Sequence, residues 1–419
     1  MNIHKFGGAS VKDANGVRNV LSIIKNLNHP IIVVISAMGK ITNAMEIVAD
    51  SYFYNDASTC QQKLNEVKAF HFSIIEELFG NKNGSEGFIR QLQLLEEKLL
   101  RKPSMHYDYE YDQIVSFGEM MSTAIVNDFL NKEHIECKWI DVRTILKTDS
   151  LYRDANVNMD LTVELMKKTF TFADTDIYLT QGFLGGTLSN ITTTLGREGS
   201  DYTAAIIGNA IDAESVTIWK DVPGVLNADP RLDADATKID ELSYMEAIEL
   251  TYYGAQVIHP KTLKPLQNKG IPLYVKSFID SAASGTIIKS AKNKNKQLPI
   301  FIVKREQFFI TISPRDFSFV MDDRLIEIIS LFKRFRIKVN LMQTSALNFS
   351  ACFDKNRQIE NLLEALKKDF FVRYNEGVEL ITIRQYTPEA INKMTEGKDI
   401  IDSQITRKVA RFVLRSDIN

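Results

Sequence analysis

A lysine followed by paired glycines forms the first candidate site in the chain. The Lys-Phe-Gly-Gly segment at residues 5–8 follows a strand-like run and precedes a helical pattern. Glycine has no Cβ, so the N–H groups of Gly7 and Gly8 can approach an anion, and a helix N-terminus favours negative charge. The ammonium group of Lys5 could neutralise a phosphate oxygen as a point charge. Taken alone, however, the segment is explained as well by a tight turn beside an exposed lysine.

A second candidate site is rich in threonine and glycine, at residues 192–201. It opens a predicted helix whose first turn carries Ser200 and Asp201. The guanidinium group of Arg197 can bind a carboxylate through two parallel hydrogen bonds, and Asp201 could orient lysines or help to hold a metal–phosphate complex. Helix capping would explain Ser200 and Asp201. It does not explain an arginine between two glycines at the same turn.

A third candidate site follows a buried strand at residues 216–219. Lys220 and Asp221 come at its carboxyl end, where open α/β sheets bind their ligands. A Pro-Gly turn follows, and Arg231 comes shortly after it. The turn alone is an adequate structural explanation, and Arg231 is equally compatible with a surface position.

Two further segments add polar groups. Ser36 and Thr42 lie just past the strand predicted at residues 31–35, and Glu119 lies in a helical pattern beside Gly118. A glycine inside a helix lowers the stability of the helix, so the presence of Gly118 suggests a functional reason. A solvated glutamate would be the ordinary interpretation of Glu119 by itself. The chain has neither a Walker A loop nor a G-x-G-x-x-G segment after a strand.

These segments need a sheet to bring them together, and the chain predicts one up to about residue 285. The apolar run at residues 31–35 is typical of a strand buried on both faces, and apolar residues at helical spacing precede it. Strand and helix alternate again between residues 200 and 275, which predicts an α/β sheet covered by helices. Two long helical patterns at residues 58–102 predict an inserted helical hairpin.

The rest of the chain predicts a different architecture. We expect a Lys-rich linker at 286–300, and then the order β-α-β-β-α-β over residues 301–377, which is the ferredoxin-like arrangement. Residues 378–419 predict a shortened second unit of the same kind, although the pattern at 384–409 is too weak to assign a fold.

Composition excludes several classes of protein. The 419 residues are too many for one compact core, and a net charge of −2 predicts no nucleic-acid partner. We find no membrane-length apolar run and no signal-peptide pattern. Three widely spaced cysteines and six scattered histidines predict a cytoplasmic protein with reduced thiols and no protein-built metal site.

Taken together, the motifs resemble those of the aspartate kinases, which belong to the amino acid kinase family. The motifs stand in the family's order: Lys-Phe-Gly-Gly at 5–8, Ser36 with Ile-Thr-Asn at 41–43, Gly-Glu at 118–119 with Ser122, Gln-Gly-Phe at 181–183, Thr-Thr-Leu-Gly-Arg at 193–197 with Gly-Ser-Asp at 199–201, Asp-Val-Pro-Gly-Val at 221–225 and Asp-Pro-Arg at 229–231. Each motif is of limited specificity, but seven in the right order are specific. The resemblance covers residues 1 to about 285, and the tail resembles the ACT regulatory domains that usually follow.

The resemblance implies an open αβα sandwich with an ACT-type α+β tail, and transfer of a phosphoryl group from Mg–ATP to the β-carboxylate of L-aspartate. This reaction is the first step toward lysine, threonine and methionine. It implies three sets of residues: catalytic Lys5, Asp201 and Arg197; ATP-binding Lys5, Gly7, Gly8, Lys220, Asp221 and Arg231; and substrate-binding Ser36, Thr42, Glu119, Arg197 and Ser200. A homodimer formed through the tail is also implied.

The chain departs from the family pattern at several positions. Ala9 replaces a usual threonine, Glu198 replaces a usual glycine, and Gln256 stands where many members have a lysine that contacts the nucleotide. We expect the Glu198 side chain to point outward. Lysine-sensitive relatives tend to have an acidic residue at the position of Asn340, so we expect lysine inhibition to be weak or absent.

Two alternatives remain open. One is a related kinase that forms an acyl phosphate on glutamate or N-acetylglutamate. Glu119 argues against an acetylated nitrogen, and the ACT-like tail argues against both substrates. The other alternative is a sensor that binds amino acid or nucleotide without turnover. Such a sensor could have lost Lys5, Arg197 or Asp201, and all three are present.

Overall fold

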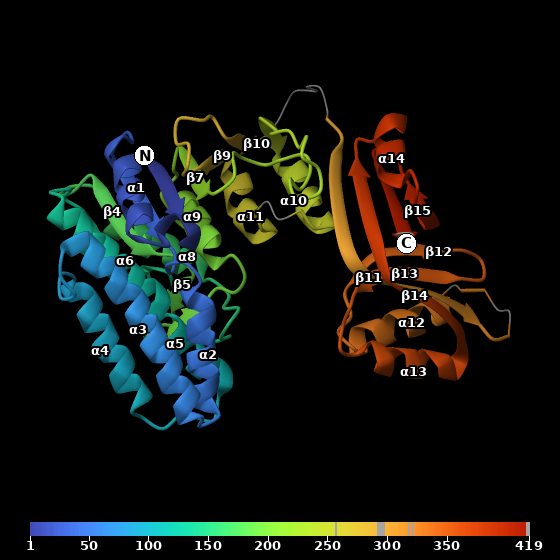
Figure 1. Cartoon of the computed structure of the whole chain (residues 1–419), viewed down its shortest axis with the longest axis horizontal. Helices are drawn as coiled ribbons and strands as arrows, with labels where there is room; N and C mark the ends of the chain where they lie inside the picture. The colour runs from blue at the N-terminus through green and yellow to red at the C-terminus, as the bar shows by residue number, and fades with distance from the viewer. Residues whose placement is uncertain (256–257, 291–297, 317–318, 321, 416–419) are drawn as a thin grey trace. The chain divides into compact units, whose positions relative to one another are not determined.

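The computed structural model describes residues 1–255, 258–290, 298–316, 319–320 and 322–415. Within them the chain forms two compact units (Figure 1). The first comprises residues 1–225, 238–248 and 256–292, and the second comprises residues 226–237, 249–255 and 293–419. Gln256 and much of the predicted linker at 286–300 lie outside the described residues. The domain boundaries proposed from the sequence therefore stay predictions.

The first unit is built on an eight-stranded sheet in the order β3-β4-β2-β1-β7-β9-β10-β8. Its strands are β1 (Asn2–Phe6), β2 (Ile31–Ile35), β3 (Lys138–Ile140), β4 (Ile177–Gln181), β7 (Ser215–Lys220), β8 (Glu241–Ser243), β9 (Leu273–Ser277) and β10 (Thr286–Lys289). The strands from β3 to β9 in this order run parallel, and β10 is antiparallel to β9. The carboxyl ends of β1, β2, β4 and β7 therefore meet at one edge of the sheet.

Helices cover both faces of this sheet. The helices of the first unit are α1 (Ala14–Lys25), α2 (Ile41–Phe53), α3 (Ala57–Phe79), α4 (Glu86–Leu99), α5 (Tyr107–Val115), α6 (Phe117–Lys132), α7 (Val142–Ile145), α8 (Met159–Thr169), α9 (Gly199–Ala210) and α11 (Pro260–Lys269), with a small hairpin of β5 (Leu184–Gly186) and β6 (Thr192–Thr194). Helix α10 (Tyr244–Tyr253) begins in the first unit and ends in the second. Val33 and Ile35 of β2 pack into the core beneath α1 to α6. On the other face, Gly208 of α9 approaches Ile3 of β1. All five residues of β2 are buried, as predicted for a strand covered on both faces.

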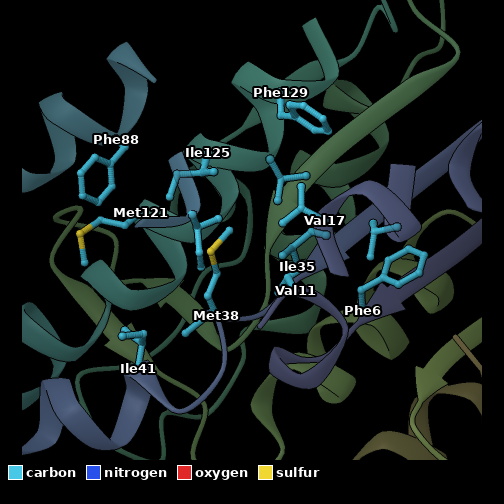
Figure 2. Packing of buried hydrophobic residues seen from close by; sticks show 14 of the residues in the cluster. Phe6, Val11, Val17, Ile35, Met38, Ile41, Phe88, Met121, Ile125 and Phe129 are labelled. Atoms are coloured by element: carbon cyan, nitrogen blue, oxygen red, sulfur yellow. The ribbon is translucent and has the colours of Figure 1, made fainter. Parts of the chain in front are cut away.

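The two long helices predicted at residues 58–102 are present as α3 and α4. Both contribute to the core of the first unit, in which Phe88 of α4 lies near Met121 of α6 (Figure 2). Gly80 ends α3 in a left-handed conformation, with φ of 81°. The pair is thus part of the helical layer over the sheet.

The second unit contains a six-stranded antiparallel sheet in the order β12-β13-β11-β14-β16-β15. Its elements are β11 (Ile300–Pro314), α12 (Asp322–Arg334), β12 (Val339–Thr344), β13 (Phe349–Asp354), α13 (Ile359–Asp369), β14 (Phe370–Arg384), α14 (Pro388–Thr395), β15 (Asp399–Ile405) and β16 (Val409–Arg415). The order from β11 to β14 is the β-α-β-β-α-β arrangement predicted. Strands β11 and β14 are long and belong to both halves of the sheet, and residue 377 lies within β14.

Candidate active site

A pocket of about 530 Å³ lies at the carboxyl edge of the parallel strands. Seven residues predicted from the sequence line it together: Lys5, Ser36, Thr42, Glu119, Arg197, Ser200 and Asp201. They come from β1, from the segment after β2, from the first turn of α2, from α6, and from the turn that begins α9. The topology thus brings together side chains that are up to 196 positions apart in the chain.

An ion pair joins the first and last of these residues. The Nζ atom of Lys5 lies 2.6 Å from Oδ1 of Asp201, and both side chains are almost fully buried. Lys5 is fixed by β1, which lies between β2 and β7, while Asp201 lies in the first turn of α9. A cation and a carboxylate at the bottom of an open pocket could bind a charged phosphoryl group and organise its surroundings.

Two helices begin at this pocket. Thr42 and Asn43 lie in the first turn of α2, and Ser200 lies in the first turn of α9. The free N–H groups and the dipole at a helix N-terminus favour negative charge. This part of the pocket is therefore suited to anionic groups of a ligand.

Close packing requires the second glycine of the pair that follows β1. A Cβ atom on Gly8 would lie 2.6 Å from the carbonyl oxygen of Gly39 and 2.8 Å from that of Ala37. A Cβ atom on Gly7 would lie 3.4 Å from Nζ of Lys5, so this residue is adjacent to the ion pair. Only glycine at residue 8 lets the turn after β1 lie against the turn after β2.

Glu119 is a buried acid at the pocket, with 2% of the residue exposed. Its Oε1 atom accepts a hydrogen bond of 3.2 Å from the N–H of Ala37, while Oε2 has no hydrogen-bond partner within the described chain. Burial raises the pKa of Glu119 to about 8, although the positive charge of Lys5 acts in the opposite direction. The hydroxyl of Ser122 donates to the carbonyl of Ser36 at 2.7 Å, which ties α6 to the end of β2. The unpaired carboxyl oxygen could accept from an ammonium group in the pocket.

Arg197 and Glu198 form the turn before α9. Both are exposed, and the guanidinium of Arg197 makes no hydrogen bond or ion pair with another residue that the structure describes. Glu198 has φ of 55°, a left-handed conformation that glycine adopts more easily. Its Oε2 atom accepts a hydrogen bond of 2.8 Å from the N–H of His259. The carboxylate of Glu198 is thus held by backbone, although the residue also lines the pocket.

The other predicted nucleotide-binding residues do not line this pocket. Lys220 ends β7, next to β1 in the sheet, and Asp221 follows it as an exposed residue. Arg231 belongs to the second compact unit and pairs with Asp229 at 2.7 Å. The nucleotide-binding roles of these residues stay predictions.

The pocket also contains residues that the sequence did not indicate as site residues: Asn43, Glu46, Tyr111, Arg153, Phe183, Gly196, Glu198 and Gly199. Asn43 and Phe183 lie within family motifs, which could have indicated them. Arg153 and Tyr111 lie in no such motif, and only the folded chain brings them to the pocket.

The described residues form no preformed metal-binding site. Across the described ranges, no group of three or more His, Cys, Asp or Glu side chains is placed to hold a metal ion. Nor does any helix in these ranges have the length and apolar character needed to cross a bilayer.

Comparisons with known proteins give consistent results. A model of the amino acid kinase family matches residues 1–277. The lysine-sensitive aspartokinase 3 of Escherichia coli (strain K12) is 30% identical over 400 residues, which cover 91% of this chain and 86% of the relative. Aspartokinase 1, chloroplastic, of Arabidopsis thaliana is 30% identical over 403 residues, which cover 91% of this chain and 70% of the relative.

Solved structures are similar over the whole chain. The structure of E. coli aspartokinase III in complex with lysine and aspartate has a TM-score of 0.83 at 28% identity, covering 99% of this chain and 95% of the other. The structure of the same E. coli enzyme with aspartate and ADP has a TM-score of 0.80 at 27% identity, covering 99% of this chain and 96% of the other. The fold of this chain, including its tail, is therefore that of these structures.

Proposed function

We propose that this chain, which belongs to the amino acid kinase family, is an aspartate kinase that transfers the γ-phosphoryl group of ATP to the β-carboxylate of L-aspartate. The product would be 4-phospho-L-aspartate. The observation that carries the proposal is one pocket that combines the Lys5–Asp201 ion pair with a guanidinium group of Arg197 and an Oε2 atom of Glu119 that have no partner among the described residues. The aspartokinase relatives, which match over 91% of the chain, support the same reaction.

The reaction needs little acid–base chemistry from the protein. A free aspartate side chain has a pKa of roughly 3.9, so the nucleophile is already ionised at neutral pH. What remains is to hold two anionic reactants in line and to neutralise the charge on the transferring phosphoryl group. Lys5 would supply the charge, Asp201 orients the lysine, and the N–H groups of Gly7 and Gly8 in the following turn could add hydrogen bonds to the phosphate.

The amino acid substrate brings two carboxylates and one ammonium group. The guanidinium of Arg197 would bind the α-carboxylate through two hydrogen bonds, because it has the matching planar geometry. Oε2 of Glu119 would accept from the ammonium group. The hydroxyl groups of Ser36, Thr42 and Ser200 would orient the β-carboxylate toward the phosphate.

Magnesium would enter the site with the nucleotide, as part of the substrate. Proteins usually bind Mg²⁺ through one or two carboxylates together with substrate phosphates, and a pocket with Asp201 at its base fits that pattern. The metal would shield the phosphate oxygens, while the described residues hold and orient the two reactants.

A hydroxamate assay tests the proposal directly. The protein is incubated with Mg–ATP, hydroxylamine and either L-aspartate or L-glutamate, because hydroxylamine traps an acyl phosphate. We expect signal with aspartate alone. Signal with glutamate alone would keep the reaction class and overturn the substrate. No signal with either would favour a sensor without turnover.

The oligomeric state and the location of the protein are not tested by the features described above. The sequence implies a homodimer formed through the tail, and gel filtration with light scattering would test it, a monomer at micromolar concentration being the contrary result. The cytoplasmic location stays a prediction from the sequence.

A further inference from the structure

A second guanidinium group lines the pocket. Arg153 lies between α7 and α8, and its side chain is 46% exposed in the pocket wall. The three cationic side chains that line the pocket are Lys5, Arg153 and Arg197. Lys5 is already paired with Asp201. Arg153 forms an exposed ion pair with Asp108 at 3.3 Å, and its guanidinium group has been used neither by the sequence motifs nor by the proposed reaction.

The side chain of Arg153 is held in place by helix α5. Its Cζ atom lies 4.4 Å from the centre of the Tyr111 ring and 5.5 Å from that of Tyr107, which are cation–π distances. Nη1 donates to Asp108 at 3.3 Å, and this is the one side-chain hydrogen bond of Arg153 to the described part of the chain. The remaining N–H groups of the guanidinium are available to a ligand.

Arg153 and Arg197 lie on segments that are in direct contact. A Cβ atom on Gly196, the residue before Arg197, would lie 3.1 Å from the carbonyl oxygen of Arg153. The buried carboxylate of Asp112 joins the same two segments. It accepts from the N–H of Arg153 at 3.1 Å, and from the N–H and hydroxyl of Thr194 at 2.9 and 2.7 Å. These contacts hold the backbones of the two arginine-bearing segments beside each other.

We propose that Arg153 is a second carboxylate-binding residue, which acts with Arg197 on the α-carboxylate of the amino acid substrate. The inference rests on the proposed function and adds a residue to the same site. A carboxylate has two oxygens and about four acceptor positions, so one arginine leaves positions that a second can fill. Two guanidinium groups on adjoining segments of the pocket wall would also select against a substrate whose α-carboxylate is replaced by a neutral group.

Kinetics of Arg153→Gln test this inference, with Arg357→Gln as the matched control because Arg357 is an exposed arginine that does not line the pocket. We expect the KM for L-aspartate to rise about 10- to 100-fold on loss of charged hydrogen bonds, while the KM for Mg–ATP stays unchanged. Arg153→Lys keeps the charge but loses the planar guanidinium group. Its KM for L-aspartate should therefore lie between that of the wild type and that of Arg153→Gln. If Arg153→Gln fails to fold, a wild-type KM for aspartate in Arg153→Lys overturns the inference.

The α-amide of L-aspartate separates a binding role from a structural one. It keeps the β-carboxylate and therefore the hydroxamate readout, but it has no α-carboxylate. We expect the penalty of Arg153→Gln to disappear with this substrate, measured as KM or as the inhibition constant against L-aspartate. An equal penalty with both substrates would overturn the inference, because a distorted pocket affects both alike. A wild-type protein inactive with aspartate would instead overturn the proposed function, and the inference with it.

Discussion

The protonation state of Glu119 should make aspartate binding depend on pH. The pKa of this buried acid is raised to about 8, so the free protein holds the group neutral below that pH. A substrate ammonium group is bound well only by the carboxylate, so binding must release the proton. Removing the proton from Glu119 at pH 7 costs about 1.4 kcal/mol, which lowers the affinity for L-aspartate about 10-fold. At pH 6 the affinity is lowered about 100-fold. The KM for L-aspartate should therefore fall steeply as pH rises from 6 and level off above 8.

The substitution Glu119→Gln tests this cause. The amide keeps the size of the side chain and an oxygen that can accept from Ala37, but it neither titrates nor carries charge. We expect its KM for aspartate to be independent of pH between 6 and 8, and at pH 8 to exceed that of the wild type by about 10- to 100-fold. The assay is initial-rate acyl-hydroxamate formation at saturating Mg–ATP.

Two controls test whether the pH dependence comes from Glu119 and concerns aspartate binding. Glu97→Gln removes an exposed carboxyl on α4 outside the pocket, and it should retain the wild-type pH profile. The KM for Mg–ATP should show no matching slope. A wild-type KM for aspartate that is flat from pH 6 to 8, or a slope that persists in Glu119→Gln, would refute the reasoning.

Four further predictions concern the ion pair, the glycine turn and the tail. Lys5→Ala should lower kcat by about 100- to 1,000-fold in the hydroxamate assay, because it removes charge from the phosphoryl site; a loss below tenfold would contradict this role. Gly8→Ala should destabilise the fold by about 1–3 kcal/mol in urea unfolding, since its Cβ would lie 2.6 Å from the carbonyl oxygen of Gly39, whereas Gly7→Ala has an extended backbone and a nearest contact of 3.4 Å, and should lose less. Millimolar L-lysine should not inhibit, because Asn340 has no charge and already accepts from Lys304 at 2.9 Å. The same contact predicts that Asn340→Asp alone will not create lysine inhibition, which a lysine titration of that variant would check.

Periodicity and motif order were sufficient to predict much of this molecule. The fold class and membership of the amino acid kinase family are confirmed by the family match and by the solved structures. The buried run at residues 31–35 and the helix that begins near Ser200 are present as predicted. Short-range signals suffice here because a strand buried on both faces and a glycine-rich helix start are determined by adjacent residues.

Other parts of the site could not be predicted from local patterns. Arg153 reaches the pocket because the buried carboxylate of Asp112 holds its backbone beside Thr194, a contact between residues far apart in the chain. The nucleotide-binding role of Arg231 is still a prediction, since this residue pairs with Asp229 in the other compact unit. Tertiary hydrogen bonds of this kind leave no periodic trace in the sequence.

The long pairing of β11 with β14 has a consequence for synthesis of the chain. Ile300 pairs with Arg384, so the first residues of β11 can pair only after a strand about eighty residues further along the chain has been synthesised. The strands of the first unit, in contrast, are all complete by Lys289. Until β14 emerges from the ribosome, residues 300–304 expose backbone N–H and C=O groups that could pair with another chain. A nascent chain stalled before residue 378 would therefore carry the complete strands of the first unit together with an unpaired β-edge, through which it could aggregate.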